Sequence, residues 1–516
     1  MIEMTLREIA EIVGGALHDV SDPAVTVTGA VEFDSRRINS GDLFLALPGE
    51  HADGHDYADK AVASGAVAVL AARPVGVPAV VVEPFGPAAE AESSRSYVLA
   101  HDSDGAGAAV LAALAKLARA SVDRLAAGGL TVVGLTGSAG KTSTKDLLVR
   151  VLEPHGAVVA PPGSFNNELG HPWTALRAGP DSRFLVLELS ARGPGHIKAL
   201  TDIAPPRIGV VLNVGTAHLG EFGGRDAIAQ AKGELVEALP ASGVAVLNAD
   251  DPRVASMAAR TRARVVTFGQ SAGADVRAAD IVVDSDARAG FTLHANGSQE
   301  QVQLAVYGEH QIANALAAAA VALECGADLA AVARALAGAT AGSAHRMDVR
   351  TRPDGVTVID DSYNANPDSM RAALKALVSM SGTGGTPDAP RGRRSWAVLG
   401  EMAELGEESV IEHDRIGRLA VRLDVDRLIV VGTGRPARAL HQGAVMEGSW
   451  GEESILVPDI ESAIAVLDNE IAAGDVVLVK ASNSAGLWAV ARHVVASGPQ
   501  SVTHGRSAGA GTEAAG

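Results

Sequence analysis

The stretch LTGSAGKTSTKD, from Leu135 to Asp146, constrains the fold more than any other part of this 516-residue chain. The apolar run LTVVG just before it is typical of a buried strand, and TSTKDLLVRVL after it has the spacing of a helix. A glycine turn between strand and helix gathers backbone N–H groups at the helix N-terminus, where the helix dipole favours an anion. The stretch therefore predicts a phosphate-binding loop in a parallel α/β sheet.

The residues of this loop follow a shortened Walker pattern. The full pattern needs glycine at position 135, where the chain has Leu135, but Gly137-x-x-Gly140-Lys141-Thr142 is intact. Lys141 is expected against the β- and γ-phosphates, with the Thr142 hydroxyl on Mg²⁺. A chance glycine turn is the alternative, and the strand and helix that flank it argue against that reading. The predicted loop consists of Gly137, Ser138, Ala139, Gly140, Lys141, Thr142 and Ser143.

Strand and helix patterns alternate along most of the remaining chain. Between about residues 130 and 340, buried parallel strands are predicted at FLVLELS, IGVVLNV, GVAVLNAD and RVVTFG. Between about 345 and 495, they are predicted at VTVID, SWAVLG, RLIVVG and DVVLVK. The fold class is therefore α/β with mostly parallel sheets covered on both faces. The predicted domains are residues 1–105, 106–342 and 343–497, followed by a disordered tail at 498–516.

Composition excludes several classes of protein. Hydrophobic content of 47% with 20% charged residues is that of a globular chain, and no apolar run reaches the roughly 18 residues that span a bilayer. A net charge of −18 argues against nucleic-acid binding, which requires a basic surface. Cys325 is the single cysteine, so no disulfide forms within the chain, as is typical of the cytoplasm. We interpret it as a small residue on an apolar helix face, in preference to a catalytic thiol.

Polar residues stand where predicted strands end, at the edge of the sheet where α/β proteins bind ligands. Glu188 ends one strand, and Asn213 and His218 follow the next, so a carboxylate and an imidazole could hold a divalent ion. A structural role for His218 is about equally favoured. Asp360 and Asp361 end a later strand, and Lys232, on a helix, is expected to be solvated.

A phosphate loop alone does not choose a reaction. The Asn-Lys-x-Asp sequence that a GTPase needs after a later strand is missing from the chain. A motor or transporter ATPase remains open, because Glu188 could serve as its strand-end acid.

Nine short segments occur in an order that resembles the Mur ligases, the ATP-dependent amide-bond-forming enzymes of peptidoglycan precursor synthesis. They are TGSAGKTS, FNNELG, ELSARGPGHI, NVGTAHLG, AKGEL, NADD, HQIANALAA, AHRMD and DDSYNANPDSM. The resemblance covers nearly the whole chain, and DDSYNANPDSM followed by VLGEMAELGEES resembles the member that adds D-Ala-D-Ala to UDP-MurNAc-tripeptide. It implies a small α/β UDP-sugar-binding domain, a central P-loop ATPase domain and a C-terminal Rossmann-like domain that holds the dipeptide.

The resemblance also implies roles for individual residues. Those expected to act in catalysis are Lys141, Lys232, His218 and Arg346, and those expected to hold two Mg²⁺ ions are Thr142, Glu188, His218 and a carbamylated Lys232. The resemblance therefore implies that Lys232 is a buried anionic site and not a solvated lysine. Further ATP contacts are Asn314 to adenine, Arg346 to the γ-phosphate and Asp361 to ribose. The expected substrate contacts are Ser35, Arg36, Asn166, Asn167, Asn364 and Asn366, although turn chemistry alone explains the last two. The chain departs from the family at Ser164, often Asn, and at His310-Gln311-Ile312, usually His-Asn-Val.

The implied reaction activates a carboxylate with the γ-phosphoryl group of ATP. The amine of D-Ala-D-Ala then attacks the acyl phosphate to give UDP-MurNAc-pentapeptide, ADP and phosphate. We expect a cytoplasmic monomer with a hinge near residues 340–346. The alternatives are another ligase of the superfamily, either amino-acid-adding or folylpolyglutamate synthetase-like, and a P-loop regulator without enzymatic activity. The third residue of the tripeptide is either meso-diaminopimelate or L-lysine.

Overall fold

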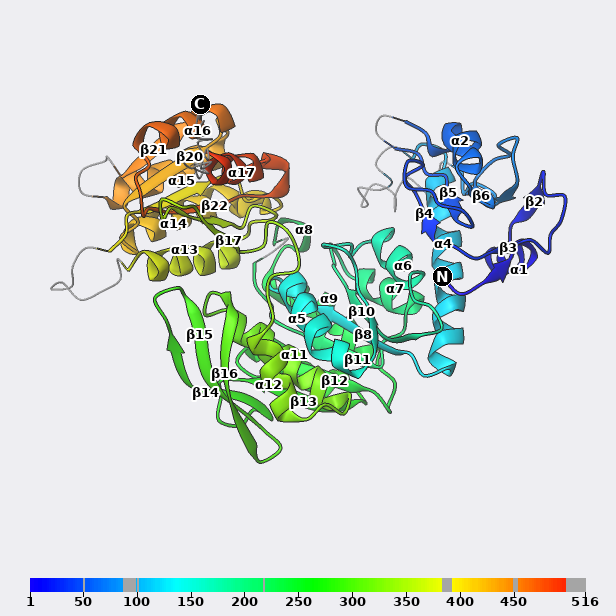
Figure 1. Ribbon diagram of the computed structural model, residues 1–516, viewed down its shortest axis with the longest axis horizontal. Coiled ribbons are helices and arrows are strands. Elements are labelled where there is room, and N and C mark those ends of the chain that lie inside the picture. Colours follow the sequence, from blue (N-terminus) through cyan, green and yellow to red (C-terminus); the bar gives the residue numbers. More distant parts are fainter. Residues whose placement is uncertain are drawn as a thin grey trace, which may run out of the picture. The chain divides into compact units, whose positions relative to one another are not determined.

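The computed structural model describes residues 1–49, 52–86, 99, 102–216, 219–382, 392–448 and 453–497 (Figure 1). Two compact units emerge from the contacts within the chain. The N-terminal unit comprises residues 1–346 together with 366–372 and 403–412, and the C-terminal unit comprises the other described residues. The tail predicted at 498–516 lies outside the described residues. So do positions 383–391 of the segment SGTGGTPDAPRGRRS (381–395), whose composition predicts a flexible loop.

A small sheet opens the N-terminal unit, with the strand order β2-β7-β6-β5-β4. β4 to β7 pair in parallel and β2 is antiparallel. Helix α1 (Leu6–Val13) begins with a capping box, in which the backbone N–H of Glu8 donates to Thr5 Oγ1 and that of Thr5 donates to the Glu8 carboxylate. The bounds are β1 (Met4–Thr5), β2 (Ala16–His18), β3 (Thr26–Val27), β4 (Val31–Glu32), β5 (Leu43–Leu45), α2 (Ala58–Ala63), β6 (Ala68–Ala71) and β7 (Ala79–Val81).

The large sheet of this unit has nine described strands in the order β16-β15-β14-β13-β12-β11-β8-β10-β9. From β9 to β14 the pairing is parallel, and every strand predicted between about 130 and 340 is confirmed. The bounds are β8 (Thr131–Thr136), β9 (Ala157–Val159), β10 (Ser182–Glu188), β11 (Ile208–Val211), β12 (Val244–Asn248), β13 (Arg264–Gly269), β14 (Val276–Val283), β15 (Arg288–Ala295) and β16 (Ser298–Tyr307).

The edge of this sheet differs from the predicted alternation of strand and helix. β14, β15 and β16 follow one another as antiparallel hairpins. Asn296 and Gly297, both with positive φ, form the turn between β15 and β16. An Asn-Gly pair between apolar alternating runs is a strong hairpin signal, and it was available in the sequence.

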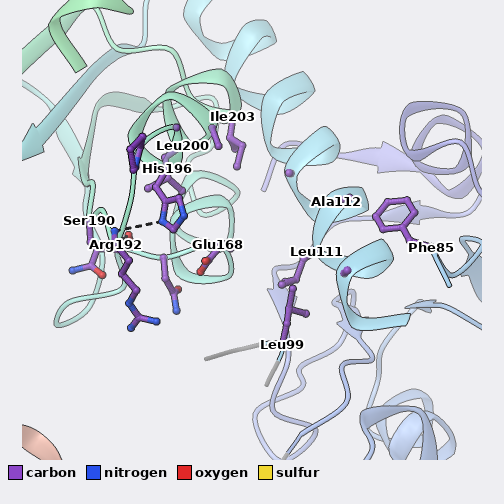
Figure 2. Close-up of a pocket in the computed structure, with 17 residues that line it drawn as sticks. Phe85, Leu99, Leu111, Ala112, Glu168, Ser190, Arg192, His196, Leu200 and Ile203 are labelled. Atoms are coloured by element: carbon purple, nitrogen blue, oxygen red, sulfur yellow. Dashed lines mark hydrogen bonds between the residues drawn. The ribbon is translucent and has the colours of Figure 1, made fainter. Parts of the chain in front are cut away.

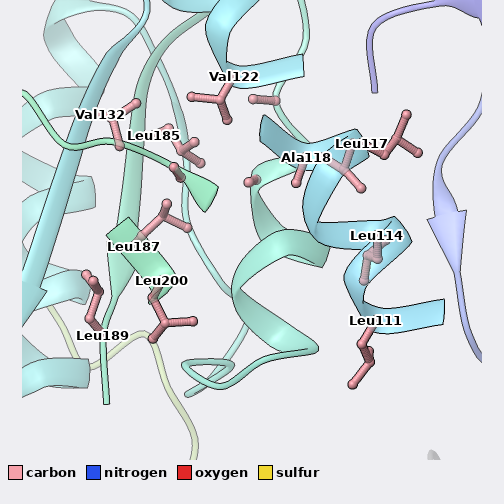
Figure 3. Packing of buried hydrophobic residues seen from close by; sticks show 14 of the residues in the cluster. Leu111, Leu114, Leu117, Ala118, Val122, Val132, Leu185, Leu187, Leu189 and Leu200 are labelled. Atoms are coloured by element: carbon pink, nitrogen blue, oxygen red, sulfur yellow. The ribbon is translucent and has the colours of Figure 1, made fainter. Parts of the chain in front are cut away.

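Helices cover both faces of the large sheet. α5 (Lys141–Leu152), α11 (Gln311–Glu324) and α12 (Leu329–Ala337) share one apolar cluster with Val133 and Val186, while Val132 and Leu187 point to the other face. There α4 (Ala106–Ala127), α7 (His196–Ile203) and β10 meet in a second cluster, shown in Figure 3. Because alternate residues of one strand serve both clusters, these strands read as continuous apolar runs. The remaining helices of four or more residues are α6 (Gly170–Ala175), α8 (Leu219–Phe222), α9 (Arg225–Glu237) and α10 (Pro252–Ala255).

The C-terminal unit is a second α/β layer structure, with strand order β17-β18-β22-β19-β20-β21. Only β17 is antiparallel among the described strands of this sheet, and the four predicted strands are confirmed as β18, β19, β20 and β22. The short strands β17 and β21 were not predicted. The bounds are β17 (Asp348–Thr351), β18 (Thr357–Asp360), α13 (Pro367–Ser381), β19 (Ser395–Leu399), α14 (Ser409–Arg422), β20 (Arg427–Val431), α15 (Arg435–Glu447), β21 (Ser454–Val457), α16 (Ile460–Glu470), β22 (Val476–Lys480) and α17 (Trp488–Ala496).

None of the helices in the described ranges is both long and apolar enough to cross a membrane.

Candidate active site

The predicted phosphate loop joins β8, in the middle of the large sheet, to the N-terminus of α5. Gly140 precedes α5 with φ of 83°, a left-handed conformation, and a Cβ there would overlap the Asn314 side chain. Lys141 curls back so that its Nζ donates to the carbonyl oxygen of Gly137 at 2.6 Å. Burial lowers the pKa of the Lys141 amine, while the negative charge of Glu188 raises it. The predicted succession of strand, glycine turn and helix is therefore confirmed, and phosphate binding by the loop stays a prediction.

Asn213, at the end of the neighbouring strand β11, holds the loop in this shape. Its Oδ1 accepts hydrogen bonds from the backbone N–H groups of Ser138 and Ala139, both at 2.9 Å, and its Nδ2 donates to the carbonyl oxygen of Ala139 at 3.0 Å. The sequence placed Asn213 at a strand end but not in this role. The spacing of residues within one segment cannot predict that a side chain from a neighbouring strand will hold the loop.

Glu188 ends β10 beside the loop and is completely buried. Its Oε2 accepts hydrogen bonds from the hydroxyls of Thr142 and Ser164, each at 3.2 Å. No donor among the described residues reaches its Oε1. Burial raises the pKa of the Glu188 carboxyl, and the positive charges of Lys145, Lys141 and Arg346 oppose that rise. The family departure at Ser164 thus supplies a hydroxyl to this carboxylate.

Lys232, on α9, is buried with 3% of its surface exposed, which agrees with the burial that the family resemblance implied and not with the solvated lysine that the helix position alone suggested. Its face of α9 packs toward the sheet, which helical spacing alone did not reveal. Burial lowers the pKa of its amine well below the ordinary value, and the charge of Lys141 lowers it further. A Cβ at the next residue, Gly233, would overlap the guanidinium of Arg260, so glycine leaves room for that side chain to donate to backbone carbonyls of α9.

Arg346 and Asn314 also lie in the N-terminal unit. The positive charge of Arg346 lowers the pKa of both the Lys141 amine and the Glu188 carboxyl. The amide of Asn314 is buried behind the loop, where it accepts from Thr144 Oγ1 at 3.2 Å and donates to Gln311 at 2.9 Å. His218 lies outside the described residues, so its role stays a prediction.

A cavity of about 600 Å³ lies on the α7 side of the same sheet (Figure 2). One wall is apolar and comes largely from α4, with Leu111 and Ala112 beside Phe85. The opposite wall is polar, and in Figure 2 the Arg192 backbone N–H donates to the ring of His196 at 3.4 Å. The polar lining residues are Asn166, Asn167, Glu168, Ser190, Arg192 and His196.

Helix α9 supports this polar wall. The Glu234 carboxylate accepts from the backbone N–H groups of Gly195 at 2.6 Å and Lys198 at 3.0 Å, at the start of α7. Glu234 stands two residues after Lys232 in AKGEL. This short segment therefore carries both a buried amine and a support for the cavity.

The predicted substrate residues do not all come together. Asn166 and Asn167 line the cavity, whereas Ser35 and Arg36 are not among its lining residues in the described chain. Arg36 is 79% exposed and pairs with Asp34 at 2.8 Å. Asn366 contacts the phosphate loop through Nδ2, 3.4 Å from the Ser138 carbonyl oxygen. Nearby, the Asp368 carboxylate accepts from the backbone N–H and hydroxyl of Thr216, at 3.0 and 3.1 Å.

Asp361 and Asn364 belong to the C-terminal unit, where Lys480 joins them. Lys480 Nζ lies 2.6 Å from Asp361 Oδ2 and donates to the Asn364 carbonyl oxygen at 2.8 Å. The backbone N–H of Met347 donates to the other Asp361 oxygen at 3.1 Å. Lys480 ends β22, and its pairing across 119 positions was not foreseen from the sequence.

Cys325 occupies the position after α11 and is half-buried, one residue beyond the helix face that we predicted. Burial raises the pKa of its thiol to about 11. The thiol is therefore protonated at neutral pH, as befits a packing residue.

Three family models match the chain. They are described as the Mur ligase family catalytic domain at residues 28–119, the Mur ligase middle domain at 135–322 and the Mur ligase glutamate ligase domain at 345–483.

Curated relatives and solved structures match nearly the whole chain. The UDP-N-acetylmuramoyl-tripeptide–D-alanyl-D-alanine ligase of Mycobacterium tuberculosis is 61% identical over 96% of this chain and 98% of the relative, and that of Escherichia coli is 32% identical over 95% and 98%. The crystal structure of MurF from Acinetobacter baumannii matches with a TM-score of 0.79 and 29% identity, over 96% of this chain and 99% of that one. The MurF ligase of Thermotoga maritima in complex with ADP matches with a TM-score of 0.72 and 30% identity, over 90% and 97%. These matches confirm the resemblance seen in the sequence: the chain belongs to the Mur ligase family.

Proposed function

We propose that this chain is the ATP-dependent ligase that joins D-Ala-D-Ala to UDP-MurNAc-tripeptide in peptidoglycan precursor synthesis. The observation that carries the proposal is a phosphate loop whose Thr142 hydroxyl lies beside a buried carboxylate, Glu188, with one open oxygen. The curated relatives supply the substrates, since their names specify both the tripeptide and the dipeptide. ATP use is further supported by the ADP complex of the Thermotoga maritima structure.

The residues around the loop fit Mg²⁺. This ion prefers oxygen ligands and is held by one or two carboxylates together with phosphates and water. Glu188 Oε1 has no donor among the described residues, and Thr142 Oγ1 lies 3.2 Å from Oε2 of the same carboxylate. We assign Thr142 to a first ion and Glu188, with His218 and Lys232, to a second. When bound, these ions would neutralise charge on the phosphate oxygens.

Lys232 fits carbamylation. An amine attacks CO₂ through its lone pair, forms an N–C bond and releases a proton, so only the neutral amine reacts. Burial and the charge of Lys141 both favour the neutral form of Lys232. The carbamate that results is an anion, and the same positive charge would stabilise it.

In the reaction, the protein aligns the reactants and compensates their charge. The tripeptide carboxylate attacks the γ-phosphorus, ADP leaves, and an acyl phosphate forms. The amine of the dipeptide then attacks the acyl carbon, and phosphate departs as the amide forms. Lys141 and Arg346, whose positive charges lie close enough to interact, would offset the negative charge of the phosphates, and charge compensation is the main catalytic task in phosphoryl transfer.

We take the remaining assignments from the resemblance to the Mur ligases. We place part of the UDP-MurNAc-tripeptide in the cavity beside Asn166 and Asn167, with Ser35 and Arg36 holding the UDP-sugar. Residues 1–105 would bind this substrate, 106–342 ATP and 343–497 the dipeptide, with Asn314 at adenine, Asp361 at ribose, and Asn364 and Asn366 at the substrates. We expect a cytoplasmic monomer.

The test is phosphate release from ATP and Mg²⁺ with UDP-MurNAc-tripeptide and D-Ala-D-Ala, each component omitted in turn, followed by product mass. Release that requires every component, with a product heavier by one dipeptide less water, supports the proposal. A response to a single amino acid in place of the dipeptide would support another ligase of the superfamily. Release without any acyl substrate would overturn the ligase function.

A further inference from the structure

Lys145 is a buried cation that the proposed reaction does not use. It lies one turn beyond Lys141 on α5, with 4% of its surface exposed. Its Nζ lies 2.6 Å from Asp146 Oδ1 and donates to Ser343 Oγ at 3.1 Å and to the carbonyl oxygen of Pro161 at 3.2 Å. Ser343 Oγ in turn donates to Asp146 Oδ1 at 3.1 Å. A buried lysine with this many partners rigidifies the segments that it joins.

These contacts join three segments of the active site. α5 carries the phosphate loop, the segment after Pro161 leads to Ser164 on the Glu188 carboxylate, and the segment around Ser343 leads to Arg346. A Cβ at Gly342 would lie 3.2 Å from Asp146 Cγ, so this segment packs tightly on α5.

The backbone on either side of Arg346 is held in an unusual conformation. His345 has φ of 60° and Met347 has φ of 51°, and both are left-handed although neither is glycine. Such residues persist only where the surroundings fix the chain, and they cluster at functional sites. Before Arg346 the chain is held by Ser343, whose hydroxyl hydrogen-bonds to Lys145 and Asp146 of α5. After Arg346 it is held by the backbone N–H of Met347, which donates to the Asp361 carboxylate.

We infer that Lys145, Asp146 and Ser343 form a latch that positions Arg346 for the γ-phosphate, with Lys145 as a positioning residue. The inference rests on the proposed role of Arg346. The latch acts by fixing the position of the Arg346 segment and not by adding charge, because the Ser343 hydroxyl is uncharged. The rival account is that Lys145 acts only through its charge on Glu188, and removal of the Ser343 hydroxyl separates the two because it leaves that charge in place.

The test is a double-mutant cycle between Ser343→Ala and Arg346→Lys in the full chain. Ser343→Ala is expected to lower kcat five- to twentyfold, with KM for the UDP-tripeptide unchanged within twofold. In the Arg346→Lys background it is expected to change kcat less than twofold, because the arginine that it positions is already gone. Ser121→Ala, at a buried serine of α4 outside the site, is the matched control and should leave kcat unchanged.

Each outcome decides between the accounts. Equal losses in both backgrounds would overturn the latch and leave the role of Arg346 intact. Full activity of Arg346→Lys and Arg346→Ala would overturn the role of Arg346 and the latch with it. A folded Lys145→Met variant gives a second test of whether the latch positions Arg346, since it removes the lysine of the latch. An unaltered kcat in that variant would also overturn the latch.

Discussion

Two carboxylates end strands in the two units of this protein, and their surroundings are opposite. In the N-terminal unit, Glu188 follows β10 with one oxygen on two hydroxyls and the other without a donor in the described chain. In the C-terminal unit, Asp361 follows β18 with one oxygen on Lys480 and the other on a backbone N–H. An acidic residue at the end of an apolar strand therefore does not by itself predict whether its carboxylate is free to bind a ligand.

The difference lies in how each charge is compensated. A buried carboxylate in a close ion pair stabilises its surroundings only while the partner remains, and removing the partner exposes a large desolvation cost. Glu188 has hydroxyls and more distant cations, so part of its charge remains for a ligand. We propose that the open carboxylate of Glu188 holds the metal ion, and that the closed pair supports the start of the C-terminal unit in addition to the ribose contact proposed for Asp361.

The largest effect is expected from Glu188→Gln. The amide keeps the shape but loses the charge that would hold Mg²⁺, so kcat should fall on the order of 10³-fold. The melting temperature should stay the same or rise, because a buried carboxyl has been neutralised. Steady-state kinetics and thermal unfolding check both points, and a loss of less than tenfold would remove Glu188 from the metal site.

Lys480→Met should destabilise the C-terminal unit, by about 3–5 kcal/mol, because it leaves Asp361 buried without its cation. Denaturant unfolding measures this loss. Adding Asp361→Asn to Lys480→Met should recover part of the stability. If the single variant were as stable as the parent, the closed pair would not be a structural support.

His171 gives a smaller, pH-dependent effect beside Glu188. The ring is completely buried against the backbone of Glu188 and Leu200, and burial lowers its pKa from 6.5 to about 4. Since the unfolded chain takes up this proton first, the stability is fully present above pH 6.5 and is lost as the pH falls toward 4. The loss should be on the order of 3 kcal/mol.

Urea unfolding between pH 7 and pH 4 measures that slope. His171→Leu, which has no titratable group, should flatten it over the same interval. An unchanged slope in this variant would assign the acid sensitivity to other groups.

Asn213→Ala is expected to have the smallest effect, because it alters the loop and neither carboxylate. It removes the acceptor shared by Ser138 and Ala139, so the loop should lose its preformed shape. KM for ATP should rise roughly five- to thirtyfold, equivalent to about 1–2 kcal/mol of binding. Asn213→Asp keeps an acceptor but adds charge near the phosphates, and should be worse than Asn213→Ala. The reverse order would mean that the amide does not act through these hydrogen bonds.

The sequence was sufficient wherever a feature depends on close neighbours in the chain. The strand β8, the glycine turn after it and the helix α5 were predicted correctly, because apolar periodicity and glycine turns are local signals. The β14–β16 hairpins were missed although Asn296 and Gly297 marked one turn, because the alternation of strand and helix was assumed to continue to about residue 340.

Errors at the candidate site have a different origin. The helix position alone suggested a solvated Lys232, because a lysine on a helix carries no mark of the face that packs, and only the family resemblance implied its burial. Asn213 and Lys480 were seen at strand ends, but their partners lie 74 and 119 positions away along the chain. Such pairs depend on which strands lie side by side, and spacing in the sequence does not record that order.

By itself the sequence determined the α/β class, the phosphate loop with Lys141 and Thr142, and the family. Only the tertiary structure decided that burial lowers the pKa of the Lys232 amine, that Glu188 keeps an open oxygen, and that Lys480 pairs with Asp361. The physical reason is that local conformation follows from neighbouring residues, whereas burial, pairing and pKa depend on groups that folding brings together from distant positions.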